Sequence, residues 1–137
     1  MDKIPLARPW VGRVEIEAVS KVIRSGMLSL GPKLLEFEQK FAEYIGSKHA
    51  IAVNSGTSGL HLCVKASNIK PGDEVITTPF SFVASSNPII FAGGKPVFVD
   101  IEESSYNIDP EKLERAITQK TKAIIIVHIF GQPCNMK

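Results

Sequence analysis

Four short apolar runs constrain the fold of this chain more than any other feature. In chain order they cover residues 50–53, 75–78, 97–99 and 123–128, and helix or turn signals separate them. Short runs of this kind are typical of strands. Strands this apolar, alternating with helices, predict a parallel or mostly parallel sheet that helices cover on both faces. The predicted fold class is therefore α/β.

Apolar residues at helical spacing predict the segments that surround these strands. Pro88 is poorly tolerated inside a helix, so the segment 80–92 is expected to kink there or to start near Asn87. Gly46 is placed as a helix C-cap, and Asp109-Pro110 is a strong helix start. The expected helices are residues 12–25, 34–45, about 58–67, 80–92 with this irregularity, and 110 to about 117.

The turn Asn54-Ser-Gly-Thr-Ser-Gly59 lies between an expected strand and an expected helix. Backbone N–H groups at the first turn of a helix favour an anion, and Ser and Thr add hydroxyl donors. Ser and Thr are also good N-caps, so an ordinary capped strand-to-helix turn is an equal alternative at this point. The turn predicts either a phosphate site or a simple cap.

Ligands of parallel α/β sheets bind beyond the carboxyl ends of the strands. The turns at residues 54–59, 79–82 and 131–133 each follow an expected strand. We therefore expect these three turns to gather at one edge and to form the candidate site.

Composition excludes several classes of protein. With 137 residues, of which 44% are hydrophobic and 22% charged, the chain is typical of one globular domain. The net charge of +2 includes no basic block, so no nucleic-acid partner is expected. The longest apolar run is too short to cross a bilayer, and the N-terminus lacks the apolar core of a signal peptide. We expect a cytoplasmic protein with no membrane partner.

The cysteines and histidines give no sign of a metal site. Cys63 and Cys134 are expected to be free thiols, with Cys63 on the apolar face of its helix and therefore in the core. His128 is interpreted as a strand-end histidine bonded to the backbone, and Asp100 as a strand-end turn residue. No metal is predicted, because the histidines lack a common spacing.

The order of motifs resembles the start of the DegT/DnrJ-type sugar aminotransferases, pyridoxal-phosphate (PLP) enzymes of the aspartate-aminotransferase fold, fold type I. The resemblance covers nearly the whole chain. It includes Gly31-Pro32, Asn54-Ser-Gly-Thr57, Pro71-Gly-Asp-Glu-Val75, Ser81-Phe82, Gly94-Lys-Pro-Val-Phe-Val-Asp100, Asn107-Ile-Asp-Pro110, Thr121-Lys-Ala-Ile124 and Val127-His-Ile-Phe-Gly-Gln-Pro133.

The resemblance implies a function and three cofactor-binding residues. Thr57 and Ser58 would bind the phosphate of PLP, and Phe82 would stack on its pyridine ring. The reaction would move an amino group from an amino acid, expected to be glutamate, to a nucleotide-linked keto sugar in polysaccharide or amino-sugar biosynthesis. The enzyme would be a homodimer.

The resemblance also implies what these residues lack. The lysine that forms a Schiff base with the cofactor is expected beyond Lys137, so the chain by itself is expected to be inactive. The predicted organisation is a partial large domain, with N-terminal helices in residues 1–49 and an α/β portion in residues 50–137. The alternative is a non-catalytic truncated domain that binds a phosphate-bearing ligand or a partner chain.

Overall fold

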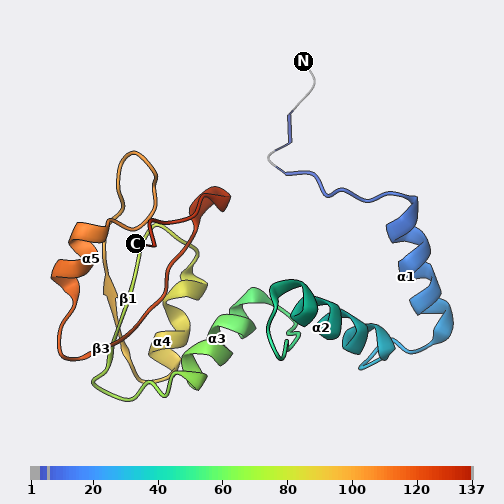
Figure 1. The fold of residues 1–137 in the computed structure, drawn as a ribbon, viewed down its shortest axis with the longest axis horizontal. Helices are drawn as coiled ribbons and strands as arrows, with labels where there is room; N and C mark the ends of the chain where they lie inside the picture. The colour runs from blue at the N-terminus through green and yellow to red at the C-terminus, as the bar shows by residue number, and fades with distance from the viewer. Residues whose placement is uncertain (1–3, 6, 137) are drawn as a thin grey trace. The chain divides into compact units, whose positions relative to one another are not determined.

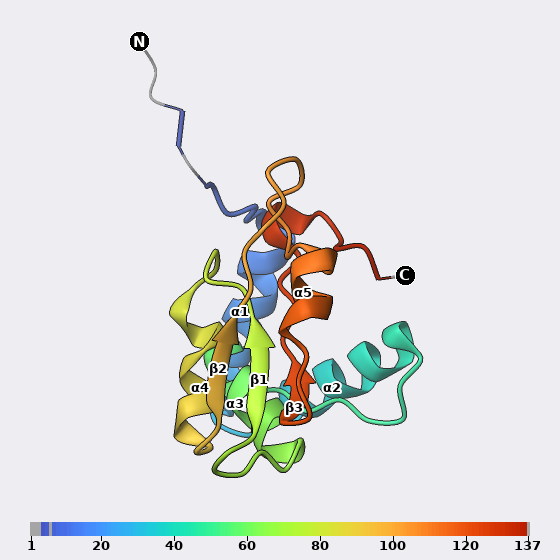
Figure 2. The ribbon, with the colours of Figure 1, turned by 90° about the vertical axis from the view of Figure 1, so that its left-hand side faces the viewer.

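A three-stranded parallel sheet organises the C-terminal part of the chain. The computed structural model describes residues 4–5 and 7–136, which form two compact units, one ending at Ala52 and the other beginning at Val53. In the second unit, β1 (Glu74–Thr77) lies between β2 (Lys95–Phe98) and β3 (Thr121–Ile124). Both neighbours run parallel to β1 (Figure 2), which confirms the predicted sheet type.

Alternate residues of β1 face two separate apolar clusters. Val75 packs on one face with residues from α3 (Gly56–Ala66) and α4 (Asn87–Phe91). Figure 1 labels both helices. Ile76 packs on the other face, where α5 (Pro110–Ala116) contributes. The sheet is thus covered on both faces, as predicted for the α/β class.

Pro88 breaks the segment 80–92 as expected. A short 3₁₀ helix, η1 (Val83–Ser85), comes first, and α4 then begins at Asn87 with the proline in its first turn. Proline is tolerated there because the first N–H groups of a helix have no intrahelical partner. At α5 the predicted cap is confirmed, since the Asp109 carboxylate accepts bonds from the amides of Glu111 and Lys112 at 2.9 and 3.2 Å.

The first predicted strand is wrong. Residues 50–53 form no strand, because no other segment among the described residues pairs with them. The amide of Ala52 instead donates to the Glu38 carboxylate at 2.8 Å. The fourth strand is shorter than predicted and shifted toward its start. Ile125 adds one further bond to Ile76, at 2.8 Å, before the chain leaves the sheet.

The first unit contains two helices, α1 (Arg13–Ser25) and α2 (Pro32–Ile45). Their C-terminal ends match the prediction, and the C-cap glycines Gly26 and Gly46 have positive φ angles of 70° and 74°. The start of α2 lies two residues earlier than predicted, at Pro32. Their apolar stripes, however, are largely exposed. Ala42 is the one buried residue within these two helices.

Cys63 corrects a second prediction, because it is exposed and not part of the core. Its neighbour Val64 points to the sheet instead, and adjacent helix residues point about 100° apart. Both cysteines are free, as expected. Within the described part of the chain, no helix is long and apolar enough to cross a membrane.

Candidate functional site

The turn at residues 54–59 is closed by a small network of side chains. Ser55 is the N-cap of α3, and its hydroxyl accepts a bond from the Ser58 amide at 3.2 Å. The Ser58 hydroxyl donates to the Asn54 side-chain oxygen at 2.7 Å and lies 3.0 Å from the Ser55 hydroxyl. The capping interpretation is therefore correct for Ser55, and it fixes the geometry of the turn.

Two amides at the start of α3 remain without a partner. Among the described residues, no hydrogen bond involves the N–H of Gly56 or of Thr57, and the exposed Thr57 hydroxyl also has none. A side-chain carbon built on Gly56 would have no heavy atom within 4 Å. Free amides at the positive end of an 11-residue helix are suited to an anion such as phosphate.

Phe82 lies in the loop that follows β1. Its extended backbone, with φ −70° and ψ 144°, comes directly before η1, and its ring is 74% exposed. Phe82 is therefore not part of the apolar core. An exposed aromatic face is available to a flat ligand.

The sequence alone did not identify several residues of this region. Asn107 is buried, and its side chain bonds to the segment after β3. Phe80 and Phe130 lie against Tyr106. The sequence did contain one signal for these two aromatic residues. Phe80 and Phe130 each come shortly after the carboxyl end of an apolar run, where ligands of parallel sheets bind.

His128 bonds to the backbone as predicted, but it lies four residues beyond the end of β3 and not at a strand end. Asp100 follows the end of β2 closely, as predicted. The His128 ring nitrogen Nδ1 accepts a bond from the Cys134 amide at 3.0 Å, and the Asp100 carboxylate accepts one from the Ile101 amide at 2.8 Å. No group of three metal-ligating side chains is found among the described residues.

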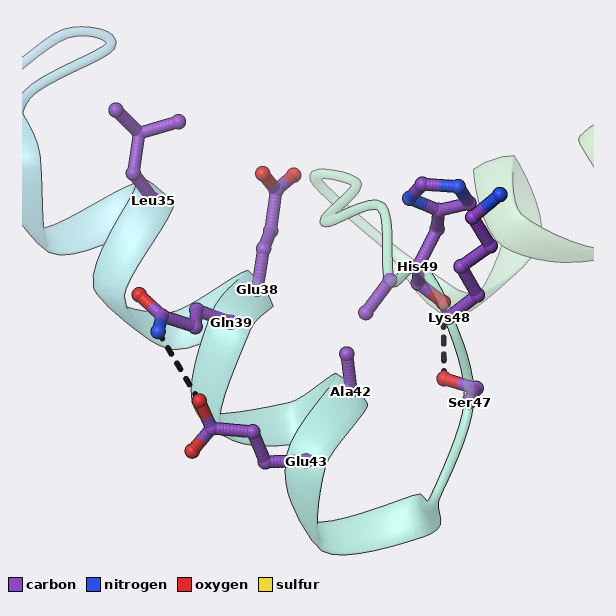
Figure 3. A pocket seen from close by; sticks show the side chains of 9 residues that line it. Leu35, Glu38, Gln39, Ala42, Glu43, Ser47, Lys48 and His49 are labelled. Atoms are coloured by element: carbon purple, nitrogen blue, oxygen red, sulfur yellow. Dashed lines mark hydrogen bonds between the residues drawn. The ribbon is translucent and has the colours of Figure 1, made fainter.

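A separate pocket of about 430 Å³ belongs to the first unit (Figure 3). Glu38 and Gln39 extend from α2, whereas Lys48 and His49 belong to the segment that follows it. None of the predicted cofactor residues lines this pocket.

Comparison with known proteins identifies the family. The model of the DegT/DnrJ/EryC1/StrS aminotransferase family matches residues 10–137. The chain belongs to this family. It is 51% identical over 133 residues to the spore coat polysaccharide biosynthesis protein SpsC of Bacillus subtilis, a match that covers 97% of this chain and 34% of SpsC.

Solved structures agree with this assignment. An aminotransferase from Psychrobacter cryohalolentis matches with a TM-score of 0.87 and 41% identity, over 95% of this chain and 34% of that one. GDP-4-keto-6-deoxy-D-mannose-3-dehydratase from E. coli, with bound hydrated PLP, matches with a TM-score of 0.92 and 35% identity. This match covers 98% of this chain and 36% of the dehydratase. The chain spans about a third of the length of these relatives. PLP is the cofactor of the family, and the fold is that of the fold-type I aminotransferases.

Proposed function

We propose that the protein to which these residues belong is a PLP-dependent aminotransferase that aminates a nucleotide-linked keto sugar. The observation that carries the proposal is the start of α3, where the amides of Gly56 and Thr57 are free. Family membership supplies the cofactor that such a turn would hold.

The turn fits the phosphate of PLP. Two amides and the Thr57 hydroxyl can donate hydrogen bonds to the phosphate, and the helix dipole stabilises its negative charge. Ser58 is the second predicted residue, but its hydroxyl donates to Asn54. Donation from that hydroxyl to the phosphate would require its bond to Asn54 to break, so Thr57 is the stronger of the two candidates.

Phe82 is proposed to stack on the pyridine ring. When bound, PLP supplies an electron sink for the bond changes at the amino-acid carbon. The lysine that would hold PLP covalently and move protons is proposed to lie beyond Lys137. The proposed role of residues 4–136 is thus to bind and orient the cofactor.

The substrates and partners are proposed from the resemblance to sugar aminotransferases. We propose glutamate as amino donor, a keto sugar carried by a nucleotide as acceptor, and a role in polysaccharide biosynthesis in the cytoplasm. A homodimer would cover the exposed aromatic stripe of α2, formed by Phe37, Phe41 and Tyr44, which are 56%, 49% and 88% exposed.

The test is amino transfer by the whole protein. With PLP, glutamate and a panel of nucleotide-linked keto sugars, we expect formation of 2-oxoglutarate and of the amino sugar. Failure across the panel would contradict the aminotransferase assignment. The 137-residue chain alone should give no turnover, and turnover by that chain would contradict the proposed place of the lysine.

The second candidate is a non-catalytic domain that binds a phosphate-bearing ligand. It is favoured by the two free amides and the free Thr57 hydroxyl, which all lie within these residues. Under this alternative, the whole protein would bind PLP phosphate but would not release 2-oxoglutarate.

A further inference from the structure

A hollow of about 340 Å³ lies beside Phe82 at the end of β1. Two segments contribute its walls, namely the loop after β1 and the short helix η2 (Ile129–Gly131). No charged side chain lines it; the lining residues are Pro79, Phe80, Ser81, Phe82, Ile129 and Phe130. The hollow suits a neutral ring better than a phosphate group.

Three aromatic rings form a cluster on this hollow. Phe80 stacks on Tyr106 with centroids 5.9 Å apart, and Phe130 meets both rings edge-on at 6.4 Å. Phe130 nevertheless remains 83% exposed. Phe80 and Tyr106 thus support one side of the Phe130 ring and leave most of its surface open.

The backbone of this cluster has an uncommon conformation. Tyr106 and Phe130 have φ angles of 59° and 52°, in the left-handed region that bulky residues rarely adopt. Such conformations persist only where surrounding contacts enforce them, and they cluster at functional sites.

Asn107 provides the contacts that hold Phe130 in place. It is 3% exposed, and its side-chain amide donates to the carbonyls of Gln132 and Pro133 at 3.2 and 3.3 Å. Its side-chain oxygen accepts a bond from the Ile129 amide at 3.1 Å. These three bonds fix the backbone on both sides of Phe130.

We infer that Phe130 contacts the hexose ring of the sugar substrate and that Asn107 is its positioning residue. The inference rests on the proposed function, in which the cofactor ring lies on Phe82 and the reacting sugar must lie next to it. The C–H groups of a pyranose can pack on an aromatic face, whereas the charged diphosphate is disfavoured in an uncharged hollow.

Saturation-transfer NMR tests this contact on the whole protein to which these residues belong. UDP-N-acetylglucosamine and GDP-mannose serve as probes, separately, because the signals of hexose, ribose and base protons can be distinguished. Phe130→Ala is compared with Phe130→Tyr, which keeps the aromatic face. The matched control is Phe91→Ala, which removes a 65% exposed ring of α4 that packs on His61.

We expect saturation to be strongest at the hexose protons of at least one probe. Phe130→Ala should weaken binding of that probe about tenfold, while Phe130→Tyr and Phe91→Ala leave it within about twofold. Asn107→Asp keeps the acceptor for Ile129 and loses both donors. This variant should weaken the saturation of the hexose protons and shift the amide resonances of residues 129–131. Thermal unfolding of the variant shows whether it remains folded.

Three results would overturn the inference: no saturation with either probe, saturation strongest at the base, or equal binding by Phe130→Ala and the unaltered chain. All of them are compatible with amino transfer by the whole protein. Failure of the inference is therefore distinguishable from failure of the proposed function.

Discussion

At the end of the sheet where β1 begins, the Glu74 carboxylate accepts bonds from Lys95 at 3.1 Å and from Thr118 at 2.8 Å. At the opposite end, the buried Thr77 hydroxyl has no partner among the described residues, and Phe82 and Phe130 are exposed. At the first end, the buried carboxylate has hydrogen-bond partners within the chain, and these bonds stabilise the fold. At the second end, a buried hydroxyl lacks a partner and two aromatic rings are exposed, as expected of a region that binds a ligand.

The largest effect is expected from Gly94→Ala, near the end where β1 begins. The added carbon would lie 2.6 Å from a methyl of Ile69 and 3.2 Å from one of Ile89, both buried. Overpacking of this kind costs about 1–3 kcal/mol of unfolding free energy. Chemical denaturation measures it, and an unchanged midpoint would show that this end is looser than the contacts indicate.

A smaller loss, dependent on pH, is expected from Glu74→Gln. The hydrogen bond from Thr118, followed by that from Lys95, lowers the pKa of Glu74 below its usual 4.5. A lowered pKa in the folded state means that the ionised carboxylate stabilises the fold at neutral pH. That contribution is lost as the pH falls below 4.5.

The melting temperature of Glu74→Gln should therefore lie below that of the unaltered chain at pH 7. The gap should narrow as the pH falls below 4.5. A gap that stays constant through this range would contradict the assignment of the effect to the charge.

At the opposite end, Phe82→Ala should affect binding without affecting the fold. Because the ring is 74% exposed, its removal should change the unfolding free energy by no more than about 0.5 kcal/mol. Affinity for pyridoxine 5′-phosphate, which lacks the reactive aldehyde, should fall about tenfold through lost stacking. Calorimetric titration checks this, and destabilisation beyond 1 kcal/mol would identify Phe82 as a structural residue.

Thr57→Ala removes one hydroxyl of the proposed phosphate site and keeps the backbone amide. We expect a loss of about five- to tenfold in affinity for pyridoxine 5′-phosphate. Ser104→Ala is the matched control, since Ser104 is exposed and makes no hydrogen bond among the described residues. Equal affinities for the two variants would remove Thr57 from the site.

The elements that the sequence predicted well carry local signals. Gly46 marks a helix end through its left-handed backbone, and Asp109-Pro110 marks a helix start through its cap. Pro88 located the start of α4 because proline is tolerated only in the first turn. These features depend on a few neighbouring residues and need no knowledge of the tertiary structure.

The elements that the sequence missed depend on distant partners. Residues 50–53 look like a strand, but a strand forms only where another pairs with it, and the Ala52 amide bonds to Glu38 instead. The role of Asn107 was missed for the same reason, because its side-chain amide bonds to carbonyls 25 and 26 positions further along the chain. Thr57, Ser58 and Phe82 remain predictions, to which the free amides of Gly56 and Thr57 add a physical basis.

The most direct test of the phosphate site removes one free amide at the start of α3. Gly56 is the first residue of the helix and follows the extended Ser55, so proline is tolerated there. Gly56→Pro deletes the N–H, whereas Gly56→Ala keeps it and adds a carbon with no heavy atom within 4 Å.

Titration with pyridoxine 5′-phosphate and with pyridoxine separates the phosphate contribution from that of the ring. We predict that Gly56→Pro binds the phosphate form about tenfold more weakly than Gly56→Ala, while the two variants bind pyridoxine equally. Equal affinities for pyridoxine 5′-phosphate in two folded variants would contradict the proposal that the start of α3 holds the cofactor phosphate.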